Sequence, residues 1–198
     1  MDYSVYFSFD RSGYLRHKKS FHPIDNSSVK DKCAIVTGGT SGIGLEVVTF
    51  LKDNNSKVFA SSRRADSDQS TANHNLVPLD MSCFKSIKKF CDEFNEKVDF
   101  LILNAGGMPE NLELNEFGIE SQHASQVVGH YLMFRLLLDQ KKLNDSCRVI
   151  WTASGGMYLV KFDEKLMNGE KQPYDKVATY ANAKRAQVIL NKMISDKH

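Results

Sequence analysis

The segment Thr37-Gly38-Gly39-Thr40-Ser41-Gly42-Ile43-Gly44 decides the fold of this chain. It joins a short apolar run to a stretch whose apolar residues have helical spacing. Glycine suits a tight turn at Gly38, a close approach of the backbone to a pyrophosphate at Gly42, and close helix–sheet packing at Gly44. The helix N-terminus would offer unpaired N–H groups to phosphates. The segment therefore predicts a dinucleotide-binding loop, with a glycine-rich turn that binds no ligand as the alternative.

Outward from this loop, apolar runs alternate with helical stretches. Strands are expected at residues 33–37, 57–61, 76–79, 98–103 and 148–152, and helices at 43–53, 84–94, 121–141 and 174–194. Pro78 favours an edge position for the third strand. The alternation predicts an α/β fold, a doubly wound parallel sheet with helices on both faces.

Composition narrows the class of protein further. The chain has 198 residues, 41% of them hydrophobic, which is typical of one globular domain with an extension. Its 26 basic and 24 acidic residues give a net charge of +2, which argues against a nucleic-acid partner. The four cysteines have no C-x-x-C spacing, so we expect no metal site and a reducing compartment, the cytoplasm. No apolar run reaches the roughly 18 residues of a membrane span.

Residues 1–31 differ from the rest of the chain. They combine several aromatic residues with the basic cluster Arg16, His17, Lys18 and Lys19. We expect an N-terminal arm that packs on the surface of a domain formed by residues 32–198. The alternative is an arm whose residues 1–20 contact an anionic membrane surface peripherally.

Further motifs follow the expected strands in order. Asp80 and Met81 follow the third strand, Asn104-Ala105-Gly106 follows the fourth, and Ser154 follows the fifth. Tyr180-Ala181-Asn182-Ala183-Lys184 lies in the last expected helix. Together with T-G-x-x-x-G-I-G, this set resembles the short-chain dehydrogenase/reductase family over residues 31–198.

The resemblance implies a Rossmann-like fold and hydride transfer between a nicotinamide cofactor and a small carbonyl or alcohol substrate, lipophilic substrates included. A homodimer through the long helix and the last helix is a further option. The implied cofactor contacts are Thr37, Gly38, Thr40, Ser41, Gly42, Ile43, Gly44, Asp80, Met81, Asn104, Ala105, Gly106, Tyr180 and Lys184.

The end of the second strand bears on the choice of cofactor. An acidic residue there would accept hydrogen bonds from a ribose 2′-hydroxyl and select NAD(H). The chain instead has Ser62 and Arg63, and a guanidinium suits a 2′-phosphate. We therefore expect NADP(H) rather than NAD(H), with a solvated basic loop as the alternative.

The expected catalytic residues are Ser154, Tyr180, Lys184 and Gln126. Tyr180 and Lys184 are four residues apart and would share one helix face, where the ammonium favours a general acid–base role for the phenol. The resemblance implies that Ser154 binds the substrate oxygen. It also places Gln126, aligned through Gly129, where the family often has an asparagine that completes a proton relay through water. An ordinary surface pair is the alternative for Tyr180 and Lys184.

The family fold continues beyond the Tyr180 helix, so we expect the domain to be C-terminally incomplete, without the sixth and seventh strands. An open pocket would work against positioning and water exclusion. Two function classes remain: an NADP(H)-dependent short-chain oxidoreductase, or a truncated, inactive cofactor-binding or interaction protein.

Overall fold

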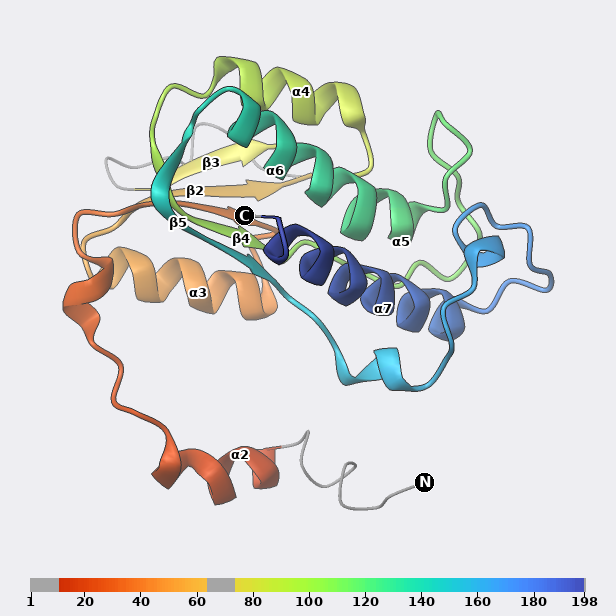
Figure 1. Cartoon of the computed structure of the whole chain (residues 1–198), viewed down its shortest axis with the longest axis horizontal. Coiled ribbons are helices and arrows are strands. Elements are labelled where there is room, and N and C mark those ends of the chain that lie inside the picture. Colours follow the sequence, from red (N-terminus) through yellow and green to blue (C-terminus); the bar gives the residue numbers. More distant parts are fainter. Residues whose placement is uncertain (1–10, 64–73, 198) are drawn as a thin grey trace.

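The computed structural model describes residues 11–63 and 74–197 (Figure 1). Five strands form one parallel sheet in the order β3-β2-β1-β4-β5. Their bounds are β1 Cys33–Thr37, β2 Lys57–Ser62, β3 His74–Pro78, β4 Val98–Leu103 and β5 Leu143–Trp151. The expected Rossmann-like α/β fold is confirmed, and the strand that ends at Pro78 lies at an edge as predicted.

Helices cover both faces of the sheet because the side chains of β1 alternate between two cores. Ala34 and Val36 pack with α3 (Gly42–Asp53) on one face. Ile35 packs with α4 (Phe84–Glu93) and α6 (His130–Asp139) on the other face. Figure 1 shows α3 on one side of the sheet and α4 with α6 on the opposite side.

The long helix expected at residues 121–141 is interrupted. It consists of α5 (Ser121–His123), a π-helical stretch Ala124–Gly129 and α6, which ends at Asp139. A side chain at Gly129 would collide with the main-chain oxygen of Met81, so the helix crosses the end of β3 very closely. A single π turn inside a helix often marks a functional site.

Several element boundaries differ from the expectation by one or more residues, and those of β5 and α7 have a clear cause. β5 begins five residues early, since Leu143 pairs with Val98 across a register irregularity. The polar residues that follow Leu143 gave no strand pattern. The last helix, α7, spans Lys176–Ser195 because Asp175 caps it by accepting the N–H groups of the second and third helical residues.

We expected the arm to pack on the surface of the domain, but its described part does not. It contains α2 (Arg11–His17), a 3₁₀ turn Lys18–Ser20 and a second turn Asn26–Val29. From residue 11 to residue 28 every side chain except Gly13 is exposed, and α2 stands away from the sheet in Figure 1. Val29 is the first residue of the arm to enter a core, where it packs with the α3 layer.

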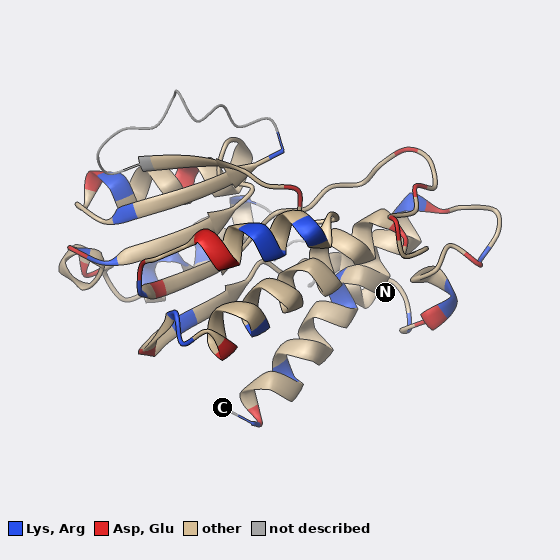
Figure 2. Ribbon diagram, turned by 90° about the horizontal axis from the view of Figure 1, so that it is seen from above, with Lys and Arg blue, Asp and Glu red and all other residues tan. Residues whose placement is uncertain are grey.

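The charged side chains are mixed in sign. Figure 2 shows basic and acidic residues interspersed along the described helices and loops. Within the described ranges, no helix is long and apolar enough to cross a bilayer.

Candidate active site

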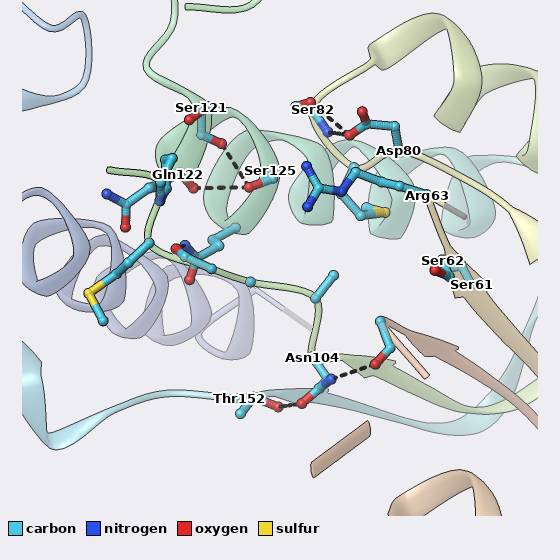
Figure 3. Close-up of a pocket in the computed structure, with 18 of the residues that line it drawn as sticks. Ser61, Ser62, Arg63, Asp80, Ser82, Asn104, Ser121, Gln122, Ser125 and Thr152 are labelled. Atoms are coloured by element: carbon cyan, nitrogen blue, oxygen red, sulfur yellow. Dashed lines mark hydrogen bonds between the residues drawn. The ribbon is translucent and has the colours of Figure 1, made fainter. Parts of the chain in front are cut away.

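A cavity of about 810 Å³ opens where the chain leaves the C-terminal ends of the strands. Ligands of open parallel sheets bind at this edge. The cavity brings together all the predicted site residues except Thr37, Gly44 and Ser154 (Figure 3). The predicted residues in its wall are Gly38, Thr40, Ser41, Gly42, Ile43, Ser62, Arg63, Asp80, Met81, Asn104, Ala105, Gly106, Gln126, Tyr180 and Lys184.

The glycine loop forms one wall of the cavity. Gly38 has a φ of 67°, and α3 begins at Gly42, so the first N–H groups of this helix lie at the wall. A side-chain carbon at Gly42 would meet no atom within 4 Å, which leaves open space for a ligand. At Gly44, in contrast, it would collide with the main-chain oxygen of Gly38. Gly44 therefore serves close packing behind the cavity.

Thr37 lies behind the wall and ties two strands to the interrupted helix. Its Oγ1 accepts the N–H groups of Asn104 and Ala105, each at 2.9 Å, and lies 2.9 Å from Nε2 of His130. Nδ1 of His130 lies 3.0 Å from the carbonyl oxygen of Gln126, which can only accept, so Nδ1 carries the hydrogen. Nε2 therefore accepts from the Thr37 hydroxyl. Burial lowers the pKa of His130 to about 3, so the ring is neutral.

Asn104 connects the ends of three strands. Its Nδ2 donates to the carbonyl oxygens of Thr37 at 3.1 Å and Gly38 at 3.3 Å, and its Oδ1 accepts from Oγ1 of Thr152 at 3.4 Å. Figure 3 shows the Asn104–Thr152 bond at the base of the cavity. The amide thus sets the spacing between the glycine loop and the end of β5.

The ends of β2 and β3 form the second wall. Ser62 and the exposed Arg63 end β2, and Figure 3 shows the guanidinium on the same side of the cavity as Asp80 and Ser82. Asp80 Oδ1 accepts the N–H of Ser82 at 2.8 Å and its Oγ at 2.7 Å, which fixes the turn after β3. Arg64, also part of the basic loop in the sequence, lies outside the described residues.

Helix α7 brings Tyr180 and Lys184 to the far end of the cavity. Lys184 is only 3% exposed, and its Nζ donates to the carbonyl oxygen of Thr152 at 2.8 Å. Burial lowers the pKa of Lys184 to about 8. The ammonium lies 5.5 Å from the centre of the Tyr180 ring, so the two side chains do share one face.

Ser154 lies outside the wall of the cavity but close to Tyr180. It begins a short 3₁₀ turn, and its Oγ accepts the N–H of Gly156 at 3.2 Å. A side-chain carbon at Gly156 would lie 3.4 Å from that Oγ and 3.7 Å from the Tyr180 ring. The missing side chain at Gly156 therefore leaves one small space that both hydroxyl-bearing residues border. No sequence motif indicated a role for Gly156.

Gln126 lies in the π-helical stretch and is fully buried in the cavity wall. Its Nε2 donates to the carbonyl oxygen of Gly107 at 3.1 Å, and its Oε1 has no hydrogen-bond partner. Its main-chain oxygen accepts from His130 and, at 2.7 Å, from Nε2 of Gln187. The side-chain oxygen Oε1 is buried, so a relay through Gln126 stays a prediction.

The wall also contains residues that no motif predicted. Glu113, Ser121, Gln122 and Ser125 contribute from the segment before and within the interrupted helix. The fold brings this segment to the cavity, and no sequence motif marks these residues. Across residues 11–63 and 74–197, no cluster of three or more His, Cys, Asp or Glu is placed to hold a metal ion.

Comparison with known proteins supports this geometry. The family model for short chain dehydrogenases matches residues 32–197. Human dehydrogenase/reductase SDR family member 12 is 30% identical over 96% of this chain and 64% of its own length. Human retinol dehydrogenase 13 is 30% identical over 85% of this chain and 55% of its own length. The chain thus spans less than two thirds of these curated relatives.

Solved structures share the fold. The Pseudomonas aeruginosa RhlG/NADP active-site complex superposes with a TM-score of 0.66 at 20% identity, over 89% of this chain and 70% of that one. A short chain dehydrogenase from Leptospira borgpetersenii with bound NAD+ gives a TM-score of 0.62 at 20% identity, with the same coverage. The family model covers most of the chain, and the fold and cavity agree with it: this chain belongs to the short-chain dehydrogenase family.

Proposed function

We propose that this chain is an NADP(H)-dependent oxidoreductase that interconverts a carbonyl compound and its alcohol. One observation carries the proposal: a single cavity has the glycine loop in one wall and the Tyr180–Lys184 pair in another. The open space at Gly42 and the N-terminus of α3 fit a pyrophosphate. A bound nicotinamide supplies or accepts the hydride.

The residues of the chain handle the proton and the substrate oxygen. In reduction, the Tyr180 hydroxyl donates its proton to the substrate oxygen as a new C–H bond forms at the carbonyl carbon; oxidation reverses both changes. Lys184, held by the Thr152 carbonyl, places a positive charge beside the phenol. Ser154 donates a hydrogen bond to the same substrate oxygen, and Gln126 Oε1 accepts one from a water that resupplies protons.

The choice of NADP(H) rests on Ser62 and Arg63. No carboxylate ends β2, and the guanidinium stands at the cavity wall, where it suits a 2′-phosphate. Replacing Arg63 by alanine should weaken NADPH binding about tenfold or more, because a charge-assisted hydrogen bond contributes about 1.5–3 kcal/mol. NADH binding should hardly change, as measured by titration of nicotinamide fluorescence.

Arg148 is the control for a change in net charge, since it is exposed on β5 and absent from the cavity wall. The variant Arg148→Ala should bind both cofactors as the unmodified chain does. Equal affinity of the unmodified chain for NADPH and NADH would refute the role of Arg63.

A lipophilic substrate is favoured by the segment after Ser154. Tyr158, Leu159 and Phe162 are exposed in this segment, outside the cavity wall. One relative is named a retinol dehydrogenase, which supports the same class of substrate. A panel of aldehydes and ketones of increasing chain length should show turnover that rises with apolar length.

Turnover should fall by at least 100-fold in Tyr180→Phe, which removes the proton donor and keeps the ring. NADPH binding should persist in this variant. If the unmodified chain binds NADPH but turns over no substrate of the panel, it is a cofactor-binding protein without catalytic activity.

For the surroundings of the protein, we propose the cytoplasm and a peripheral membrane contact of the arm. All four cysteines are free, which fits a reducing compartment. The exposed Tyr14, Leu15 and Phe21 stand beside basic residues, a composition that suits anionic lipid. Co-sedimentation with anionic but not with neutral vesicles tests the membrane contact.

A further inference from the structure

Three fully buried polar residues that the proposed chemistry does not use form a chain behind the cavity. Glu120, His123 and Asn182 each have an exposed fraction of 0%, and none of them lines the cavity. Oε2 of Glu120 lies 2.9 Å from Nδ1 of His123, and Nε2 of His123 lies 3.0 Å from Nδ2 of Asn182. The chain joins α5 to α7 two residues after Tyr180.

The donors and acceptors in this chain follow from its chemistry. The amide nitrogen of Asn182 can only donate, so Nε2 of His123 accepts and its Nδ1 carries the hydrogen. Nδ1 donates to Glu120, whose Oε2 also accepts the N–H groups of Gln122 and His123 at 3.0 and 3.1 Å. The two bonds of Asn182 to the main chain of Asp163 support this orientation of its amide independently.

In that orientation Asn182 binds both main-chain groups of Asp163. Its Nδ2 donates to the Asp163 carbonyl oxygen at 2.9 Å, and its Oδ1 accepts the Asp163 N–H at 2.8 Å. The N–H of Glu120 donates to the carbonyl oxygen of Met167 at 2.8 Å. The buried chain thus holds the segment between β5 and α7 at two points.

Helix α7 fixes the same segment nearer to Ser154. Lys184 binds the carbonyl oxygen of Thr152, and Nε of Arg185 donates to that of Met157 at 3.1 Å. The exposed apolar residues Leu159 and Phe162 lie between Met157 and Asp163. The position of this apolar stretch relative to Tyr180 therefore depends on Asn182 at its far end.

We propose that Glu120, His123 and Asn182 are positioning residues that hold segment 155–163 against the Tyr180 helix and thereby set where the stretch after Ser154 lies relative to Tyr180. The link to the substrate rests on the proposed function, whereas the clamp itself does not. Loss of the clamp should loosen the segment and leave the glycine loop in place.

Hydrogen–deuterium exchange followed by mass spectrometry tests the clamp without any activity. Asn182→Leu keeps the number of side-chain heavy atoms and removes the three hydrogen bonds, so peptides within 155–167 should exchange at least tenfold faster. Gln187→Leu is the matched control, because Gln187 is an equally buried amide of α7 that donates to Gln126 instead. Equal exchange of 155–167 in the two variants would overturn the proposal.

If Asn182→Leu does not fold, a second pair of variants, at His123, tests the clamp. His123→Gln retains an oxygen that can accept from Asn182, whereas His123→Leu has none. The glutamine variant should preserve most of the protection of 155–167, and the leucine variant should lose it at least fivefold. Similar exchange in the two variants would show that His123 only fills space.

Kinetics separate this proposal from the proposed function. In Asn182→Leu, KM for a carbonyl substrate should rise about tenfold, while the Kd for NADPH stays within twofold. An unchanged KM would refute the link to the substrate. Absence of turnover in the unmodified chain would refute the proposed function, and the exchange data would still judge the clamp.

Discussion

The ammonium group of Lys184 is buried, and burial destabilises its charged form. Its folded-state pKa is about 8, against 10.5 for an exposed lysine, because burial penalises the ammonium. Between these values the unfolded chain binds more protons than the folded one, so this residue makes the folded state more stable as pH rises. Such a cost at one buried lysine is typical of a functional site.

Comparison with Lys184→Met should reveal this dependence. Near pH 7 both states of the unmodified chain carry the charge, and the full cost is present. We compare the free energy of unfolding of the unmodified chain with that of the variant. This difference should rise in favour of the unmodified chain by up to about 3 kcal/mol as pH rises from about 8 to 10.5. Urea unfolding of both proteins at several pH values measures this difference. The contributions of titratable groups that both proteins share cancel in it. A constant difference would contradict the burial of this charge.

At the residue scale, motif spacing predicted many residues of the cavity wall, because the glycine loop and Asn104 follow strand ends and Tyr180 and Lys184 share one face of a helix. It could not predict that Thr37 lies behind the wall, because its partners Asn104 and His130 belong to other elements. Buried links of this kind depend on the crossing of strands and helices, which no periodicity encodes.

At the scale of elements, strands with two covered faces were predicted well. The bounds of β1 and β4 agree with the expectation because both are mainly apolar. The π-helical stretch was not predicted; it contains Gly129, which passes close to the main chain of Met81, a contact between elements that sequence spacing does not encode. The N-terminal half of β5 was missed because residues 144–146 are polar, although Leu143 pairs with Val98 of β4.

The hydrogen bonds of Thr37, which connect β1 with the chain after β4 and with α6, should contribute to the free energy of unfolding. Thr37→Val keeps the volume but leaves the N–H groups of Asn104 and Ala105 without their acceptor. Each unsatisfied buried group costs about 1–3 kcal/mol, so we expect a loss of at least about 2 kcal/mol in the free energy of unfolding. Urea denaturation with a constant m-value would measure it.

A second threonine offers the control for this substitution. Thr179 is 1% exposed, and its hydroxyl has no hydrogen-bond partner. Thr179→Val should therefore be neutral or stabilising by the same measurement. If both valine variants lost the same stability, loss of the hydroxyl in general, and not the tie at Thr37, would be responsible.

At the scale of the whole molecule, the arm and the sheet domain differ in the solvent exposure of their apolar side chains. Tyr14, Leu15 and Phe21 are 51%, 53% and 54% exposed, and the rings of Tyr14 and Phe21 lie 5.8 Å apart. Val29, by contrast, is 9% exposed and packs with Val48 and the rest of that core. Cooperative unfolding of the sheet domain should therefore depend on the chain from Val29 onward.

Substitutions on either side of that point should separate the two parts. Serine at all three exposed positions should change the free energy of unfolding by no more than about 0.5 kcal/mol, as is usual for surface substitutions. Val29→Ala should lower it by about 2 kcal/mol, because it opens a cavity beneath α3. Urea unfolding of both variants provides the comparison. A loss above about 1 kcal/mol in the triple serine variant would mean that the arm packs on the domain in solution, since exposed side chains contribute no burial for the substitution to remove.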